Sequence, residues 1–224
     1  MRITLVYDNT VCRRELTADW GFSCLIEMEG SPKILFDTGA KGHILLSNME
    51  KLAIDPSTVE IVVISHFHWD HTGGLADFLE VNHTAKLYLP ASFRKSFPGR
   101  EVVEVAESIQ VCENVYSTGE LEGIEQSLVL KTDTGLVVIA GCSHPGVGTI
   151  LKAASQFGNV SALIGGLHGF REFGLLQDLQ LVCACHCTQH QSEIKRLYPE
   201  KWVEGGAGKV LSFYPHLSCR LHRR

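Results

Sequence analysis

The sequence predicts a single α/β (α+β) domain built as a four-layer αββα sandwich, with two sheets packed face to face and helices outside them. Short β-rich runs separated by turn-forming residues open the chain, as in a meander. Two later segments, which begin at residues 61 and 137, repeat one pattern of apolar strand, histidine-containing polar loop and helix. Composition is even from end to end, without a linker, so one domain over residues 1–224 is the simplest interpretation.

Periodicity predicts the elements of the first half. The opening strands are expected at residues 2–7, 22–28 and 33–37. A helix is expected at 43–52, because Ile44, Leu45 and Met49 fall on one side of it. The uninterrupted apolar run at 61–64 is typical of a strand buried on both faces. A helix at 73–81 and a short strand at 86–89 follow.

The second half is less regular at its start. Residues 92–123 are expected to form a short helix and several short strands. Two strands, at 127–131 and 136–140, flank Asp133-Thr134-Gly135, which predicts a tight hairpin. The remaining elements expected are helices at 147–157 and 189–197, and strands at 160–164 and 209–213.

Composition excludes several classes of protein. Hydrophobic residues make up 45% of the chain and charged residues 20%, as in ordinary globular domains. The net charge of −5 gives no general attraction to nucleic acid or to anionic membranes. No apolar run has the length of a membrane span, and the N-terminus is typical of a strand and not of a signal peptide. A cytoplasmic location is therefore expected, with the eight cysteines as thiols or metal ligands.

The strongest functional signal is the segment 65–74, Ser-His-Phe-His-Trp-Asp-His-Thr-Gly-Gly. In extended backbone His66 and His68 point the same way, so they can bind one ion. Asp70 and His71 come where the chain turns, and they can bind a second. Imidazole with carboxylate suits zinc, iron or manganese. A cluster of solvated loop residues is the alternative, but this density of ligands behind a buried strand has little structural purpose.

The pattern H-x-H-x-D-H resembles the signature of the metallo-β-lactamase superfamily, and Phe36-Asp37-Thr38-Gly39 resembles its early strand-ending motif. Several further segments resemble one subfamily, which often carries the name 7,8-dihydropterin-6-yl-methyl-4-(β-D-ribofuranosyl)aminobenzene 5′-phosphate synthase. These segments are 48–52, 141–146, 165–168, 186–188 and 208–210. The resemblance runs from about Leu5 to about Phe213. It implies the four-layer fold and a role for Asp37 in supporting the metal loop.

The sequence departs from the superfamily at two metal-binding elements, because the common Gly-His-Thr and Gly-Asp motifs are absent. His144 is the preferred third ligand of the first ion because it lies in the repeated strand–loop–helix pattern; a histidine that binds backbone at the helix entry is the alternative. Gly141-Cys142 stands where Gly-Asp is expected, so Cys142 or His144 could take the bridging position. We predict that His144 ligates metal and that Cys142 does not, because Gly141 and Pro145 break the extended backbone between them.

His186 follows the apolar run 181–185 and fits a ligand of the second ion. His168, in a glycine-rich loop, contacts substrate or metal, or only stabilises a turn. Cys183 and Cys185 are expected to be small apolar residues of a buried strand, and the role of Cys187 is left open. Four other histidines are expected at the surface. They are His43, His190, His216 and His222.

These residues predict a cytoplasmic hydrolase with two divalent metal ions, zinc first and manganese or iron as alternatives, acting on a small-molecule ester, lactone or phosphoester. Asp70 would bind one ion and orient the attacking water, and Asp37 would orient a metal-binding histidine. The resemblance implies an alternative, a transferase that condenses a dihydropterin diphosphate with ribofuranosylaminobenzene phosphate. A nuclease, a mononuclear iron redox enzyme and a non-catalytic metal sensor are less favoured. Nucleic acid and membrane partners are not expected.

Overall fold

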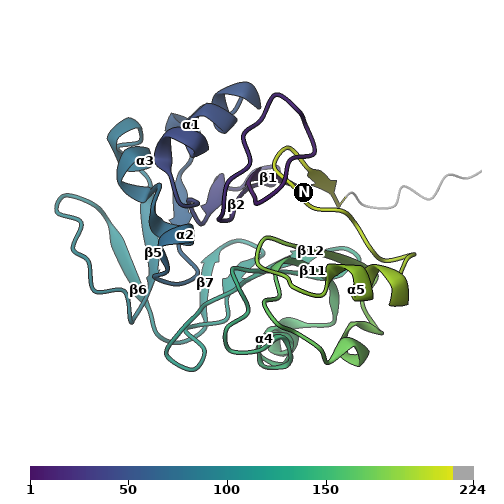
Figure 1. Cartoon of the computed structure of the whole chain (residues 1–224). Coiled ribbons are helices and arrows are strands. Elements are labelled where there is room, and N and C mark those ends of the chain that lie inside the picture. The colour runs from purple at the N-terminus through teal and green to yellow at the C-terminus, as the bar shows by residue number, and fades with distance from the viewer. Residues whose placement is uncertain (214–224) are drawn as a thin grey trace, which may run out of the picture.

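The computed structural model describes residues 1–213, and in this range two sheets stack face to face between two layers of helices (Figure 1). Helices α1 (Gly42–Lys51) and α3 (Leu75–Val81) cover the outer face of one sheet. Helices α4 (Val147–Ala154) and α5 (Gln191–Leu197) cover the other. The predicted four-layer αββα sandwich is therefore confirmed.

The first sheet has the strand order β13-β1-β2-β3-β4-β5-β6. Its strands are β1 (Arg2–Tyr7), β2 (Ser23–Glu27), β3 (Ile34–Phe36), β4 (Ile61–Val63), β5 (Lys86–Pro90), β6 (Val102–Val105) and β13 (Val210–Ser212). Strands β3 to β6 run parallel, whereas β1 pairs antiparallel with both of its neighbours. Strand β4 is buried along its whole length, as its apolar sequence predicts.

The second sheet has the order β12-β11-β10-β9-β8-β7. Its strands are β7 (Ile109–Cys112), β8 (Val115–Ser117), β9 (Leu128–Thr132), β10 (Gly135–Ala140), β11 (Val160–Gly166) and β12 (Leu181–Cys185). Strands β9 and β10 pair antiparallel, with Thr132 opposite Gly135, so the predicted hairpin is confirmed. Strands β10, β11 and β12 run parallel, so their carboxyl ends meet at one edge.

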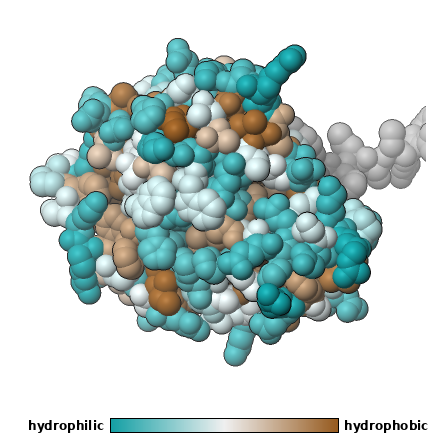
Figure 2. All heavy atoms as spheres, in the orientation of Figure 1, coloured by the Kyte–Doolittle hydropathy of each residue, from teal (hydrophilic) through white to brown (hydrophobic). Residues whose placement is uncertain are grey.

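Three apolar layers hold the sandwich together. The layer between the sheets contains inward-facing residues of both, such as Phe22, Val63 and Ile139. A second layer lies under α1 and α3 and includes Phe78, and a third lies under α4 and α5 and includes Ile150. Figure 2 shows that the apolar side chains on one face of the molecule are divided into small patches among hydrophilic ones.

Two predictions of local structure need correction. Residues 92–123 contain the strands β6, β7 and β8 but no helix. The helix predicted at 73–81 begins only at Leu75, as α3, and a separate short α2 (Trp69–Thr72) precedes it; between the two, Gly73 and Gly74 press against the backbone that follows β3. A Cβ on Gly73 would come within 2.0 Å of the Ala40 carbonyl oxygen. These glycines therefore serve close backbone packing.

The repeated strand–loop–helix pattern places two loops opposite each other. Strand β4 leads through residues 64–68 into α2, and β10 leads through residues 141–146 into α4. His68 Nδ1 in the first loop lies 3.2 Å from His144 Nε2 in the second. Separately, no helix within residues 1–213 combines the length and apolarity that crossing a bilayer requires.

Candidate metal centre

Three imidazole nitrogens meet where the two loops face each other. His66 Nε2 lies 3.0 Å from His68 Nδ1, and His144 Nε2 lies 3.2 Å from the same atom. Two nitrogens bound tetrahedrally to one zinc ion at about 2.0–2.1 Å would be about 3.3 Å apart. The spacing therefore fits a common ion, and we propose these histidines as the first ligand set.

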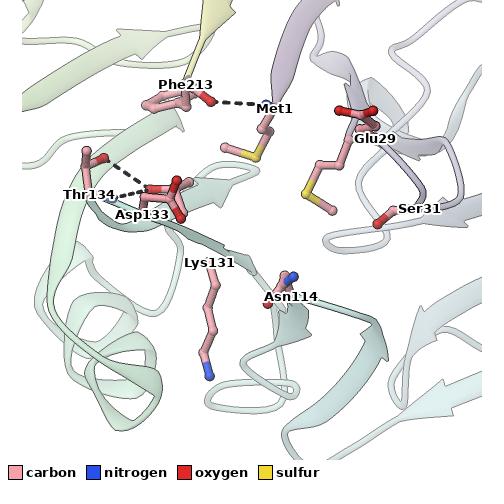
Figure 3. Close-up of a pocket in the computed structure, with 10 residues that line it drawn as sticks. Met1, Glu29, Ser31, Asn114, Lys131, Asp133, Thr134 and Phe213 are labelled. Carbon is pink, nitrogen blue, oxygen red and sulfur yellow. Dashed lines mark hydrogen bonds between the residues drawn. The ribbon is translucent and has the colours of Figure 1, made fainter. Parts of the chain in front are cut away.

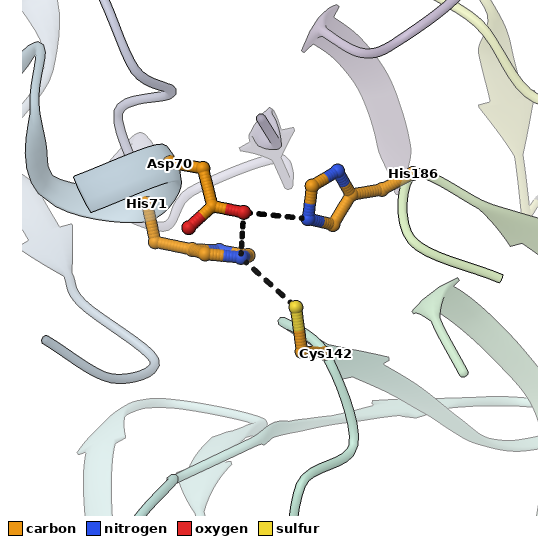
Figure 4. A group of neighbouring side chains, drawn as sticks. All are labelled: Asp70, His71, Cys142 and His186. Carbon is orange, nitrogen blue, oxygen red and sulfur yellow. Dashed lines mark hydrogen bonds and ion pairs between the residues drawn. The ribbon is translucent and has the colours of Figure 1, made fainter. Parts of the chain in front are cut away.

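A second set surrounds Asp70, whose Oδ2 lies 3.3 Å from His186 Nε2 and 3.8 Å from His71 Nε2 (Figure 4). Asp70 and His71 belong to α2, whereas His186 directly follows β12. The buried Nε2 of His186 makes this ion-pair contact with Asp70 but has no hydrogen-bond partner in the described structure. An unpartnered buried imidazole nitrogen is costly, and an ion at this point would satisfy it.

Hydrogen bonds to the other ring nitrogens fix the orientation of these ligands. Asp37 is fully buried and accepts hydrogen bonds from the Ser65 amide, the Ser65 hydroxyl and His71 Nδ1, each at 2.7 Å. The Ser65 hydroxyl in turn accepts from His66 Nδ1 at 2.9 Å. His66 and His71 therefore keep their protons on Nδ1 and turn their Nε2 lone pairs toward the centre. Asp37 thus supports one histidine of each set.

The irregular loop at residues 8–21, after β1, supports the second set. The Asn9 side-chain oxygen accepts a hydrogen bond from His186 Nδ1 at 3.0 Å, and Asp8 accepts one from the His186 amide. Trp20 Nε1 donates to Asp70 Oδ2 at 2.9 Å. No periodic pattern or motif in this loop points to such contacts, and the sequence analysis missed them.

Cys142 corrects a premise of the sequence analysis, which expected the backbone to turn its side chain away from His144. Its Sγ lies 3.2 Å from His71 Nε2 and is almost fully buried. The candidate ligand atoms of His66, Cys142 and His144 lie within 4.8 Å of one another. Those of Asp70, His71, Cys142 and His186 do so as well. Cys142 therefore faces the centre together with His144.

Glu125 holds the loop that carries Cys142 and His144. Its Oε1 accepts hydrogen bonds from the amides of residues 141, 142 and 143, and its Oε2 accepts one from the His144 amide at 2.9 Å. Burial raises the pKa of Glu125 to about 7, against the opposing effect of these four donors. A Cβ at position 141 would come within 2.3 Å of Ser65 Oγ, so this position requires glycine. Glu125 was not identified from the sequence, because its contacts depend on how the loops fold together.

The backbone around the centre is strained. Among the non-glycine residues with a positive φ, four belong to this site: Asp37 (57°), Ser143 (61°), His168 (47°) and His186 (49°). Each such conformation costs on the order of 1–3 kcal/mol, and such residues concentrate at functional sites. The surrounding hydrogen bonds hold these positions in place.

Electrostatics favours the neutral form of three candidate ligands, two of the first set and one of the second. Burial lowers the pKa of His66, His71 and His144, and the neighbouring histidines lower the pKa of each further. These imidazoles are therefore neutral at pH 7, with lone pairs free for an ion. Burial also lowers the pKa of His186, but the Asp70 carboxylate beside it raises this pKa above its ordinary value.

The remaining candidates lie at the margin of the centre or away from it. The exposed His168 has its ring 5.1 Å from that of His144, and its ligand atom lies within 4.8 Å of those of Cys142 and Cys187. Cys183 and Cys185 are buried in the core between the sheets. The surface histidines divide into three cases: His43 is exposed, His190 is half-buried, and His216 and His222 lie outside the described residues. The seven cysteines in the described range are free thiols, as expected.

Two recesses border the ligand loops. One, of about 350 Å³, is lined by Phe67 of the first loop and Thr72 of α2 together with Phe93, Arg94 and Lys95. The other, of about 360 Å³, adjoins residues 143–147 and 167–172. A third cavity lies at the opposite end of β10, beside its hairpin and Met1 (Figure 3). The first two are therefore the positions from which a small molecule could approach the centre.

Known proteins resemble this chain in sequence. The family model of the metallo-beta-lactamase superfamily matches residues 19–147. The chain is 25% identical to a 7,8-dihydropterin-6-methyl-4-(beta-D-ribofuranosyl)-aminobenzene-5'-phosphate synthase of Methanocaldococcus jannaschii, over 94% of this chain and 95% of that protein. It is 24% identical to an uncharacterized protein of the same organism, over 93% of this chain and 99% of that one.

Solved structures share the fold. Tm1679, described as a metal-dependent hydrolase of the beta-lactamase superfamily, has a TM-score of 0.74 at 26% identity, covering 96% of this chain and 100% of that chain. YhfI of Bacillus subtilis has a TM-score of 0.69 at 12% identity, covering 94% and 98% of the two chains. Because the family model matches more than half of the sequence, this chain belongs to the metallo-beta-lactamase superfamily.

Proposed function

We propose that the protein is a metal-dependent hydrolase that cleaves a small, negatively charged ester, with phosphoesters as the preferred class. The observation that carries this proposal is the meeting of two ligand sets, one of three histidines and one centred on Asp70, at one edge of the sandwich. Two divalent ions there, zinc first and manganese or iron as alternatives, would activate water and polarise the oxygen of the scissile group.

Cationic side chains favour an anionic substrate. Arg94 and Lys95 line the recess beside Phe67, and Arg171 lines the recess beside His144 together with the acidic Glu172, so the charge is clearest in the first recess. Arginine binds phosphate oxygens with two parallel hydrogen bonds, and lysine binds them as a point charge. The phenyl rings of Phe67 and Phe93 would cover an apolar or aromatic part of the same molecule.

The chain's own residues would divide the remaining work. Asp70, held by Trp20, would orient the attacking water through one carboxylate oxygen. His168 is exposed beside His144 and would donate a proton to the leaving oxygen. Its position at the rim gives it access to a substrate that the buried histidines lack.

A second candidate function is the condensing transferase. The synthase of Methanocaldococcus jannaschii, whose name states a pterin and a phosphate, aligns with nearly the whole of both chains. The arginine and lysine side chains of the two recesses would bind a diphosphate and a phosphate. Hydrolysis is preferred because 25% identity does not fix a reaction within a superfamily whose members share one fold.

A product analysis of the metal-loaded protein separates the two functions. Phosphomonoesters, phosphodiesters and lactones are offered singly, and a dihydropterin diphosphate is offered with and without ribofuranosylaminobenzene phosphate. Hydrolysis consumes water and a single substrate, giving an alcohol from a phosphoester or a hydroxy acid from a lactone, whereas condensation requires both substrates and releases diphosphate. Arg171→Gln and Lys95→Gln are expected to raise KM for anionic substrates, while the exposed Lys152→Gln on α4 leaves KM unchanged. Equal turnover by His66→Ala and wild type would contradict the proposal.

A further inference from the structure

The thiol of Cys142 stands between the two ligand sets. Its Sγ approaches His71 Nε2 to 3.2 Å, and the side chain is 3% exposed. Figure 4 shows it pointing from the loop after β10 toward His71 and Asp70. Glu125 binds the Cys142 amide at 3.0 Å, so the backbone that directs the thiol is fixed.

One sulfur atom belongs to both groups of candidate ligand atoms. It lies within 4.8 Å of the ligand atoms of His66 and His144, and within 4.8 Å of those of Asp70, His71 and His186. Paired ions in such sites are about 3.5–4 Å apart, and zinc–sulfur bonds are about 2.3 Å long. A single sulfur atom can therefore reach both ions of such a pair.

The neighbouring hydrogen bonds leave the sulfur free for this role. His71 keeps its proton on Nδ1 for Asp37, so its Nε2 offers a lone pair toward Cys142 Sγ. His186 Nε2, in a side chain 5% exposed, also points into this space and makes no hydrogen bond. Two imidazole nitrogens, together with a thiol whose proton an ion can displace, form a set suited to a cation.

We propose that Cys142 binds as a thiolate and is shared by both ions of the centre. This inference rests on the proposed two-metal site. On binding, the thiol proton would pass to solvent, and the sulfur would be held between the two ligand sets whose atoms it approaches. Thiolate ligation favours zinc, cobalt and iron over manganese and magnesium, so it also narrows the choice of metal.

Cobalt(II) reports this ligation without any substrate, through a near-ultraviolet charge-transfer band that only a thiolate ligand gives. Wild type, Cys142→Ser and Cys187→Ser are stripped of metal and titrated with cobalt(II). Cys187 is the matched control, because it is a second buried thiol whose Sγ lies 3.9 Å from the Cys142 carbonyl oxygen. The band is expected in wild type and Cys187→Ser, and its loss is expected in Cys142→Ser.

The titration also tests sharing. A shared thiolate makes the band grow over both the first and the second equivalent of cobalt, and Cys142→Asp is expected to bind two equivalents without the band. A band that survives in Cys142→Ser, or disappears in Cys187→Ser, overturns the assignment. A band complete at one equivalent, with a second ion bound silently, overturns the sharing. Two bound ions without any band refute only this inference, whereas failure to bind cobalt refutes the proposed function too.

Discussion

At the residue scale, Asp70 is where the contacts of the second ligand set meet. Its Oδ2 accepts a hydrogen bond from Trp20 and lies close to both His71 and His186. Although burial opposes it, the interactions with these two histidines lower the pKa of the Asp70 carboxyl, which is therefore ionised at neutral pH. A fixed negative charge at this position is what a second divalent ion requires.

Asp70→Asn is expected to lower the affinity for the second ion by at least about 100-fold, since even the loss of a residue that only supports a metal ligand costs 10–100-fold in affinity. Turnover falls with it, while the free energy of unfolding of the metal-free protein changes little, because the amide keeps the shape of the side chain. Competition with a chromophoric chelator measures affinity. Asp133→Asn, in the distant hairpin, is the control. Unchanged affinity for both ions would exclude Asp70 as a ligand.

Asp37→Asn tests the support of both sets from one buried carboxylate. An amide retains one acceptor oxygen but presents an NH₂ group to a donor, so a buried hydrogen bond is lost at a cost of about 1–3 kcal/mol. Urea unfolding of the metal-free variant is expected to show this loss, and metal titration a 10–100-fold weaker affinity. Wild-type values in both measurements would mean that Asp37 neither stabilises the fold nor orients His71.

At the element scale, the centre depends on loops that follow parallel strands. Strands β4 and β10 each end in a loop that carries ligands, and β12 ends at His186. Parallel pairing through β11 aligns the carboxyl ends of β10 and β12 in one sheet, whereas β4 belongs to the other sheet, whose stacking brings its loop to the same edge. The contact between His68 and His144 joins residues 76 positions apart. The stacking of the two sheets, more than any local motif, therefore assembles the centre.

Glu125→Gln tests whether the loop after β10 must be held rigidly. The NH₂ group of glutamine would replace one carboxylate oxygen. It would then face a backbone amide that also donates, either the amide of His144 or the amides that now donate to Oε1. The expected result is a near-native circular dichroism spectrum, a loss of about 1–3 kcal/mol in stability, and weaker metal binding. The exposed Glu122→Gln, in the same connection, is the control and should behave as wild type. Wild-type metal affinity in Glu125→Gln would show that Cys142 and His144 keep their positions without the hydrogen bonds to Glu125.

At the scale of the whole molecule, the fold is built around apolar layers that contain none of the histidine or aspartate ligands. Removal of metal should therefore leave the secondary structure intact, in contrast to small zinc domains that unfold without their ion. Ligand binding still stabilises the native state, by about 4 kcal/mol when the free metal is 1,000-fold above its dissociation constant. Chelation should lower Tm without changing the far-ultraviolet circular dichroism spectrum. A collapse of that spectrum would identify the centre as structural.

The sequence by itself determined those features whose signal is local. Residues 66–71 predict metal binding, because their spacing alone brings potential ligands together. Asp133-Thr134-Gly135 predicts a turn, because only a few residue types fit one. Strands such as β4 are recognisable because burial on both faces requires an uninterrupted apolar run. Residues 92–123 lack such periodicity, and there a helix was wrongly expected.

Only the tertiary structure decided how distant residues complete the centre. The sequence does not reveal that Trp20, Asn9 and Glu125 hold the candidate ligands in place. A hydrogen bond between residues distant in sequence produces no periodic pattern from which it could be predicted. The direction of the Cys142 side chain depends on backbone angles that Glu125 and a positive φ at Ser143 impose. The sequence therefore identified which residue types could bind metal. The packing of the two sheets decided which of their side-chain atoms lie close enough to bind the same ion, because contacts between residues distant in sequence set the direction of each side chain.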